Sequence, residues 1–189
     1  YVDLPLQHAS AAVLTRMRRP GTRHTYDRLL RRIRDRVPGV SLRTTFIVGF
    51  PGETDEDFDE LCRFVADTAF DHVGVFTYSH EEGTRAFELP DDVPAAVKRR
   101  RRRRVMTLQQ RIVARTHQRR IGERVRVMID GPAPDHPLVL RGRLSGQAPD
   151  IDPLVYLTEC DPASYRPGDL IAAEIVGSRD YDLVARPLP

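Results

Sequence analysis

The chain has 189 residues, 40% of them hydrophobic, and a formal net charge of +3 at pH 7. A chain of this length can bury one sizeable core or two modest ones. It has no apolar run of about 18 residues that could span a bilayer and no signal-peptide pattern, so we expect a cytosolic protein. Its two cysteines, Cys62 and Cys160, are too few for an iron–sulfur or structural metal site.

The first part of the chain predicts strands that alternate with helices. Residues 1–6 are strand-like and have no polar lead-in, which predicts that the chain begins inside a domain. Ser10 is a candidate N-cap for a short helix. A second helix is expected from about Thr25 to the Pro-Gly stop signal at 38–39.

Residues 44–54 carry the most informative local motif. Residues 44–48 favour a strand, Gly-Phe-Pro-Gly at 49–52 breaks it, and Thr54, with Asp57 three positions on, is placed to cap a helix. In a parallel α/β sheet such a loop lies at the carboxyl end of its strand, where glycine lets a ligand approach closely. An ordinary strand-to-helix turn is the alternative interpretation.

A further strand is predicted at residues 72–78, followed by a polar loop at 79–84. The order β-α-β-α-β favours parallel strands, and three strands are too few to close a barrel, so we expect half of a (β/α) barrel. Because half a barrel leaves strand edges unpaired, residues 1–93 alone should be marginally stable or prone to aggregate.

A long helix is expected from Pro94 to about Arg120, with six consecutive arginines at 99–104. A basic run of this density could contact nucleic acid. The chain has 29 arginines and one lysine, however, and this bias favours a solvated helix face instead.

Residues 122–189 have a different sequence pattern, which predicts a small β-barrel of the OB type. Short strands are expected at residues 124–129, 139–144, 154–158, 170–176 and 183–186. We therefore expect two domains, residues 1–121 and 122–189. The second has 7 arginines against 11 acids and the first has 23 basic residues against 16 acids. An acidic barrel suits a basic protein better than a phosphate backbone.

Several segments resemble the radical S-adenosylmethionine (SAM) methylthiotransferases. The resemblance implies an α/β partial (β/α) radical SAM barrel, made of its last three strands, followed by a small all-β, OB-like TRAM barrel. The segments that carry it are residues 1–10, 17–20, 43–54 and 78–84 in the first part, and residues 148–152 and 181–186 in the second.

The resemblance also implies a substrate. One branch of the family adds a methylthio group to the β-carbon of an aspartate in the twelfth small-subunit ribosomal protein, and another modifies adenosine in tRNA. The tRNA branch usually reads Pro-x-Gln-Ser-Gly-Ser where this chain has Pro-Leu-Gln-His-Ala-Ser at 5–10. This departure, the Ala-Pro-Asp-Ile-Asp segment at 148–152 and the acidic barrel together imply the ribosomal-protein branch, with the acidic barrel binding the basic substrate protein. A tRNA methylthiotransferase and a non-catalytic RNA- or ribosome-binding module are the alternatives, and the electron donor is unknown.

The implied cofactors are SAM and two [4Fe–4S] clusters of the full-length enzyme. The family's Cys-x-x-x-Cys-x-x-Cys motif and three further cysteines are expected upstream of Tyr1, so this chain alone should be inactive. The resemblance gives it no metal ligand and no assigned catalytic residue.

Ten residues match cofactor-binding positions of the family. The loop at 49–52 would lie against the adenosyl group, residues 7 and 10 near ribose and methionine, residues 43 and 45 on the fifth barrel strand, and residues 76 and 78 against adenine. The aromatic rings at 50 and 76 could instead be core residues, and Glu53 could cap a helix rather than touch a ligand. The ten residues are Gln7, Ser10, Arg43, Thr45, Gly49, Phe50, Pro51, Gly52, Phe76 and Tyr78.

Overall fold

The computed structural model describes residues 1–133 and 136–189, which form two compact units. The first is Val2–Gln109 and the second is Gln110–Pro189 together with Tyr1. Helix α4 (Ala95–Arg120) contributes residues to both. Within the described ranges, no helix has the length and apolar character needed to cross a bilayer.

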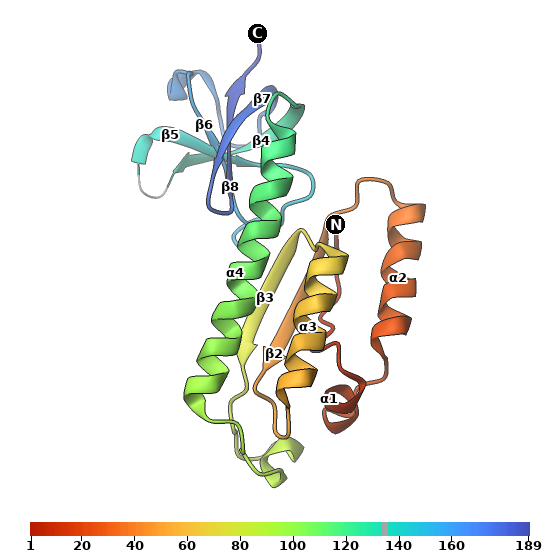
Figure 1. Ribbon diagram of the computed structural model, residues 1–189. Coiled ribbons are helices and arrows are strands. Elements are labelled where there is room, and N and C mark those ends of the chain that lie inside the picture. Colours follow the sequence, from red (N-terminus) through yellow and green to blue (C-terminus); the bar gives the residue numbers. More distant parts are fainter. Residues whose placement is uncertain (134–135) are drawn as a thin grey trace. The chain divides into compact units, whose positions relative to one another are not determined.

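The first unit is built on a parallel sheet with the strand order β1-β2-β3. Its strands are β1 (Val2–Asp3), β2 (Leu42–Val48) and β3 (His72–Thr77). Helices α1 (Ala11–Arg16) and α2 (Arg23–Arg36) join β1 to β2, and α3 (Asp55–Thr68) joins β2 to β3 (Figure 1). The predicted alternation of strands and helices with parallel pairing is confirmed.

Strand β1 is shorter than the predicted strand at 1–6 because the chain leaves the sheet around Pro5, which has no backbone N–H to donate. The buried Thr44 hydroxyl fills the gap by donating to the Leu4 carbonyl at 2.8 Å. The chain rejoins the sheet at Gln7, whose N–H donates to the Thr45 carbonyl and whose carbonyl accepts from Ile47, both at 2.9 Å. Gln7 has a φ of +70°, which marks a sharp turn at this point.

The helix caps explain where the helices begin. Ser10 caps α1, and Thr54 caps α3 in a capping box completed by Asp57, as predicted. Helix α2 begins at Arg23 rather than at Thr25, because Thr22 is its N-cap and the Thr25 side chain completes the capping box. The expected start at Thr25 was therefore wrong by about half a turn.

One face of the sheet carries the core of the first unit. Alternate residues of β2 are buried, and among them Phe46 packs edge-to-face against Phe64 of α3 and against Phe70, with ring centroids 6.2 and 6.0 Å apart. The residues between them, such as Thr45 and Ile47, point to the opposite face and are only half-buried.

Helix α4 provides partners for the β3 side of the sheet. Arg102 donates through Nε to the Val75 carbonyl of β3 at 3.0 Å, and Gln109 donates to the Phe70 carbonyl at 2.8 Å. Val105, on the same helix, is fully buried. Among the described residues, no further strand pairs the outer edges of β1 and β3, as expected, and on the β3 side Arg102 gives one strand carbonyl a side-chain partner.

The second unit is a closed β-barrel with the strand order β4-β5-β6-β8-β7, in which β4 also pairs with β7. This confirms the predicted five-stranded barrel among the described residues. Strands β6 and β8 pair in parallel, and the other neighbours are antiparallel. The strands are β4 (Arg124–Ala133), β5 (His136–Arg143), β6 (Val155–Leu157), β7 (Leu170–Arg179) and β8 (Asp182–Pro187).

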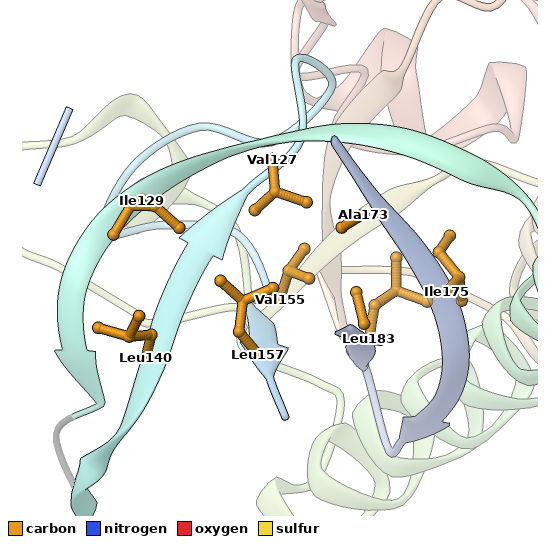
Figure 2. Packing of buried hydrophobic residues seen from close by; sticks show 9 residues of the cluster. Val127, Ile129, Leu140, Val155, Leu157, Ala173, Ile175 and Leu183 are labelled. Carbon is orange, nitrogen blue, oxygen red and sulfur yellow. The ribbon is translucent and has the colours of Figure 1, made fainter. Parts of the chain in front are cut away.

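The barrel interior is filled by aliphatic side chains that point inward from every strand (Figure 2). Val127, Val155 and Ile175 are fully buried there, and Leu140 and Leu157 almost so. A closed barrel leaves no free strand edge, so this unit needs no further strand to complete its pairing.

The partners that α4 supplies lead to a prediction about truncation. A chain of residues 1–93 loses Val105 and the side chains that bond the Val75 and Phe70 carbonyls, so it should be marginally stable or aggregate. A chain of residues 1–120 keeps them and should show the larger, more cooperative urea transition by circular dichroism. A cooperative, concentration-independent melt of monomeric 1–93 would show that α4 is dispensable.

Candidate functional site

Three loops meet at one edge of the parallel sheet. Residues 7–10 follow β1, residues 49–54 follow β2 and residues 78–84 follow β3, so all three leave from the carboxyl ends of their strands. The Tyr78 N–H donates to the Val48 carbonyl at 2.9 Å, which ties the third loop to the second. In α/β proteins this edge is where ligands bind.

A buried carboxylate shapes the glycine loop. The Glu53 side chain has no solvent exposure, and its Oε2 accepts hydrogen bonds from the N–H groups of Gly49 and, at 3.1 Å, of Phe50. Gly49 and Gly52 have φ values of +74° and +73°, which favour glycine. Glu53 therefore folds the loop back on itself instead of capping α3, whose N-cap is Thr54, and it does not point to solvent.

Arg101 of α4 holds the same carboxylate from the other side. Its Nη1 lies 3.3 Å from Glu53 Oε1 and donates to the Glu53 carbonyl at 3.0 Å, while Nη2 donates to Asp55 at 2.7 Å. The hydrogen bond and charge of Arg101 hold the pKa of the exposed Asp55 carboxyl below its usual value. Sequence reasoning missed this role because it treated the arginine run as one solvated face.

A sequence signal for Arg101 did exist. Lys98, Arg101, Val105 and Gln109 follow one another at helical spacings of three and four and are all buried. Lys98 pairs with Asp91 at 2.5 Å and lies 4.9 Å from the ring centre of Tyr78. The buried face of α4 thus continues into its basic run.

Ser10 connects the first loop to α3. Its hydroxyl donates to Asp57 Oδ1 at 2.5 Å, and Asp57 also accepts from the Thr54 N–H at 3.0 Å. Arg16 adds a contact at 3.5 Å to Asp57 Oδ2. Burial raises the pKa of the Asp57 carboxyl, but the hydrogen bonds from Ser10 and Thr54 and the charge of Arg16 outweigh it, so the pKa is lowered overall.

His8 lies behind these loops and is fully buried. Its Nδ1 accepts from the Ser10 N–H at 3.0 Å, which leaves the proton of a neutral ring on Nε2. Nε2 lies 3.9 Å from Glu53 Oε1. His8 therefore faces the interior of the loop cluster.

The uncovered face of the sheet carries three of the ten predicted residues. Arg43 and Thr45 are half-buried on this face, and Phe76 is 63% exposed. Gly74 lies between the last two, since a Cβ added to it would sit 3.4 Å from Thr45 Oγ1 and 3.9 Å from the Phe76 ring. The missing side chain leaves room beside a hydroxyl and an aromatic ring.

The other seven residues lie in the loops at the edge of the sheet, and Gln7 among them is half-buried. Phe50 is buried with its ring 5.1 Å from that of Tyr78 in an edge-to-face contact. Ser10, Gly49 and Pro51 are also buried, whereas Gly52 and Tyr78 are half-buried. Burial raises the pKa of the Tyr78 phenol, with help from Asp91 and Glu81, so the hydroxyl stays protonated and donates to the Ala86 carbonyl.

The cysteines of this chain do not fit an iron–sulfur cluster. Cys62 is buried on α3 and Cys160 is half-buried in the other unit. Burial raises the pKa of both thiols, which disfavours the thiolate that ligates iron. In the described part of the chain, no group of three metal-ligating side chains comes together.

Comparison with known proteins identifies the two units. A model of the radical SAM superfamily matches residues 1–65, and a model of the TRAM domain matches residues 121–188. Coproporphyrinogen III oxidase (HemN) from Escherichia coli, a radical SAM enzyme, shares the fold with a TM-score of 0.51 over 77% of this chain and 40% of its own, at 14% identity. The parallel sheet is therefore part of a radical SAM barrel, and the chain belongs to the radical SAM methylthiotransferase family.

Within this family the chain is similar to enzymes named ribosomal protein uS12 methylthiotransferase RimO. It is 46% identical to the Myxococcus xanthus protein over 98% of this chain and 38% of the relative. It is 44% identical to the Geotalea uraniireducens protein over 100% of this chain and 42% of the relative. The chain thus spans about two fifths of the length of the curated relatives it matches.

The close approach of Lys98 to Gly49 gives a prediction with a matched control. Gly49 and Gly39 share a φ of +74°, but a Cβ on Gly49 would run into the Lys98 side chain, whereas a Cβ on Gly39 meets nothing within 4 Å. Both alanine substitutions carry the left-handed penalty of ~1–2 kcal/mol. Gly49→Ala should lower the free energy of unfolding by about 1–3 kcal/mol more than Gly39→Ala in urea denaturation. Equal losses would contradict the packed position of Lys98.

Asp57 gives a prediction about pH. Because its folded pKa lies below the ordinary value of 3.8, it contributes stability above that pH and loses it as the pH falls through the folded pKa. The difference in unfolding free energy between the wild type and Asp57→Asn should therefore be full at neutral pH and shrink below pH 3.8, in urea titrations at several pH values. Ser10→Ala should move this decline to higher pH. A difference that grows on acidification would contradict the assignment.

Proposed function

We propose that this chain is part of a methylthiotransferase that adds a methylthio group to the β-carbon of an aspartate in ribosomal protein uS12. The observation that carries the proposal is the 44–47% identity, over nearly the whole chain, to proteins named for that activity. The uncovered sheet face, with its space at Gly74, supports a cofactor site in the same part of the fold.

The chain's own residues would bind and orient SAM. Bound together with a reduced cluster, SAM supplies a carbon-centred radical that can remove a hydrogen atom from the substrate. Arg43 and Thr45 would offer polar groups on the uncovered face, Gln7 a polar group in the loop after β1, and the Phe76 ring an apolar wall. The buried members of the ten predicted residues would act by holding the loops in shape, and Tyr78 would border the site.

The two [4Fe–4S] clusters in this proposal are held by parts of the enzyme other than this chain. Cys62 and Cys160 lie in different units with protonated, buried or half-buried thiols. The chain would then contribute cofactor placement, substrate orientation and exclusion of water.

We further propose that the barrel, taken as residues 122–189 with residues 1–121 as the other domain, binds uS12 in the cytoplasm. Its 7 arginines against 11 acids give a surface that attracts a basic protein. The electron donor is left open in this proposal.

One observation favours the tRNA branch instead. The exposed Phe76 borders a hollow of about 600 Å³ lined by Thr77, Met106, Arg99, Arg102 and Arg103. An aromatic ring beside arginines can stack a base and contact phosphates. The test must therefore distinguish the two substrates.

A chimera provides this test. The N-terminal part of Myxococcus xanthus RimO, followed by this chain, would be expressed in cells that lack their own uS12 and tRNA methylthiotransferases. Mass spectrometry should find the methylthio group on uS12 and not on tRNA adenosine. Modification of tRNA alone would establish the second reading, and failure to modify either substrate, with the chimera folded and its clusters loaded, would refute both.

A further inference from the structure

We propose that Arg101 is a positioning residue for the cofactor site, which it controls through the Glu53 carboxylate and the loop amides of Gly49 and Phe50. The inference rests on the proposed function, because it concerns the loop beside the proposed SAM site. It separates Arg101 from the other members of the arginine run at 99–104.

The first step in the argument is burial. The Arg101 side chain is 5% exposed and that of Glu53 is fully buried, whereas the neighbouring Arg99, Arg100 and Arg103 are exposed. A buried carboxylate needs a partner of opposite charge, and Arg101 is the guanidinium that lies against it, at 3.3 Å.

The second step is the path from Arg101 to the loop. Glu53 has two carboxylate oxygens with different roles. Oε1 faces Arg101, while Oε2 accepts the N–H groups of Gly49 and Phe50. Arg101 also donates to the Glu53 carbonyl, so both the side chain and the backbone of this residue are held by one guanidinium.

The third step is the consequence for the site. Phe50, which is held at its N–H by Glu53, packs against the ring of Tyr78 at 5.1 Å. Tyr78 begins the loop after β3, and its N–H bonds the last residue of β2. Displacing Glu53 therefore shifts the loops that follow β2 and β3. The proposed SAM-binding surface beside these loops then loses its shape.

The contact itself can be checked in the chain as it stands. The hydrogen bond from Arg101 is the largest cause that lowers the pKa of Asp55. In Arg101→Met, an NMR titration should find the Asp55 pKa higher than in the wild type. Amide hydrogen exchange at Gly49 and Phe50 should become at least about tenfold faster, since Glu53 loses the guanidinium that fixes it and holds the two amides less firmly.

Arg100→Met is the matched control, because it removes an exposed arginine from the adjacent position of the same helix. It should leave the exchange of both loop amides unchanged. A double variant, Arg101→Met with Glu53→Gln, removes both buried charges and keeps an acceptor for the loop amides. It should recover part of the protection lost in the single variant.

Kinetics of the chimera distinguish positioning from loss of folded protein. In Arg101→Met the KM for SAM should rise by about tenfold and the KM for uS12 should not change. Arg101→Lys, which keeps the charge but not the planar fork, should show an intermediate rise. Mere unfolding would lower kcat and leave both KM values unchanged, and that result would overturn the proposal.

The two proposals fail in different ways. If the wild-type chimera modifies no substrate, the proposed function fails, while the exchange experiment still reports on the path from Arg101 to the loop. If the wild type is active and Arg101→Met matches Arg100→Met in both amide exchange and the KM for SAM, the role of Arg101 is refuted.

Discussion

The buried carboxylate of Glu53 is the interaction on which the first unit depends. A carboxylate cannot stay charged in the interior unless its oxygens are paired, and here two loop amides and one guanidinium pair them. This single group therefore joins the glycine loop after β2 to helix α4, across 48 positions of sequence. His8, at 3.9 Å, brings the loop after β1 to the same point. Three separate segments meet at one buried side chain.

The two faces of the sheet carry different kinds of side chain. One face is packed against α3 through Phe46, Phe64 and Phe70, and it supplies the core. The other presents Arg43, Thr45 and Phe76, and a polar or exposed aromatic side chain there gains nothing from packing against a helix. Because strand residues alternate between faces, both sets come from the same short strands. The predicted site residues thus separate into those that can face a ligand and those that shape the loops.

The arginines at 99–104 are identical in sequence but make three different kinds of contact. Arg101 is buried against Glu53, Arg102 bonds a strand carbonyl, and Arg104 pairs with Asp59 at 2.9 Å on the surface. The remaining members are exposed. Counting charge along the sequence cannot separate these roles, because consecutive residues of a helix point in directions about 100° apart. The helix face that is buried by packing decides which guanidinium becomes structural.

Local sequence patterns were enough to predict the elements and the kind of fold. Thr54 with Asp57 and the Gly-Phe-Pro-Gly turn specified a strand, loop and helix, and the five short strands after residue 122 specified a barrel, because caps, turns and alternation act locally. Pro5 and Thr22 also act locally but were misjudged, at the end of one strand and the start of one helix. Only the folded chain shows that Ser10 and Phe50 are buried, that Gly74 leaves room beside Phe76 and that Arg101 reaches Glu53. These contacts join residues distant in sequence, and no local pattern records which side chains will meet.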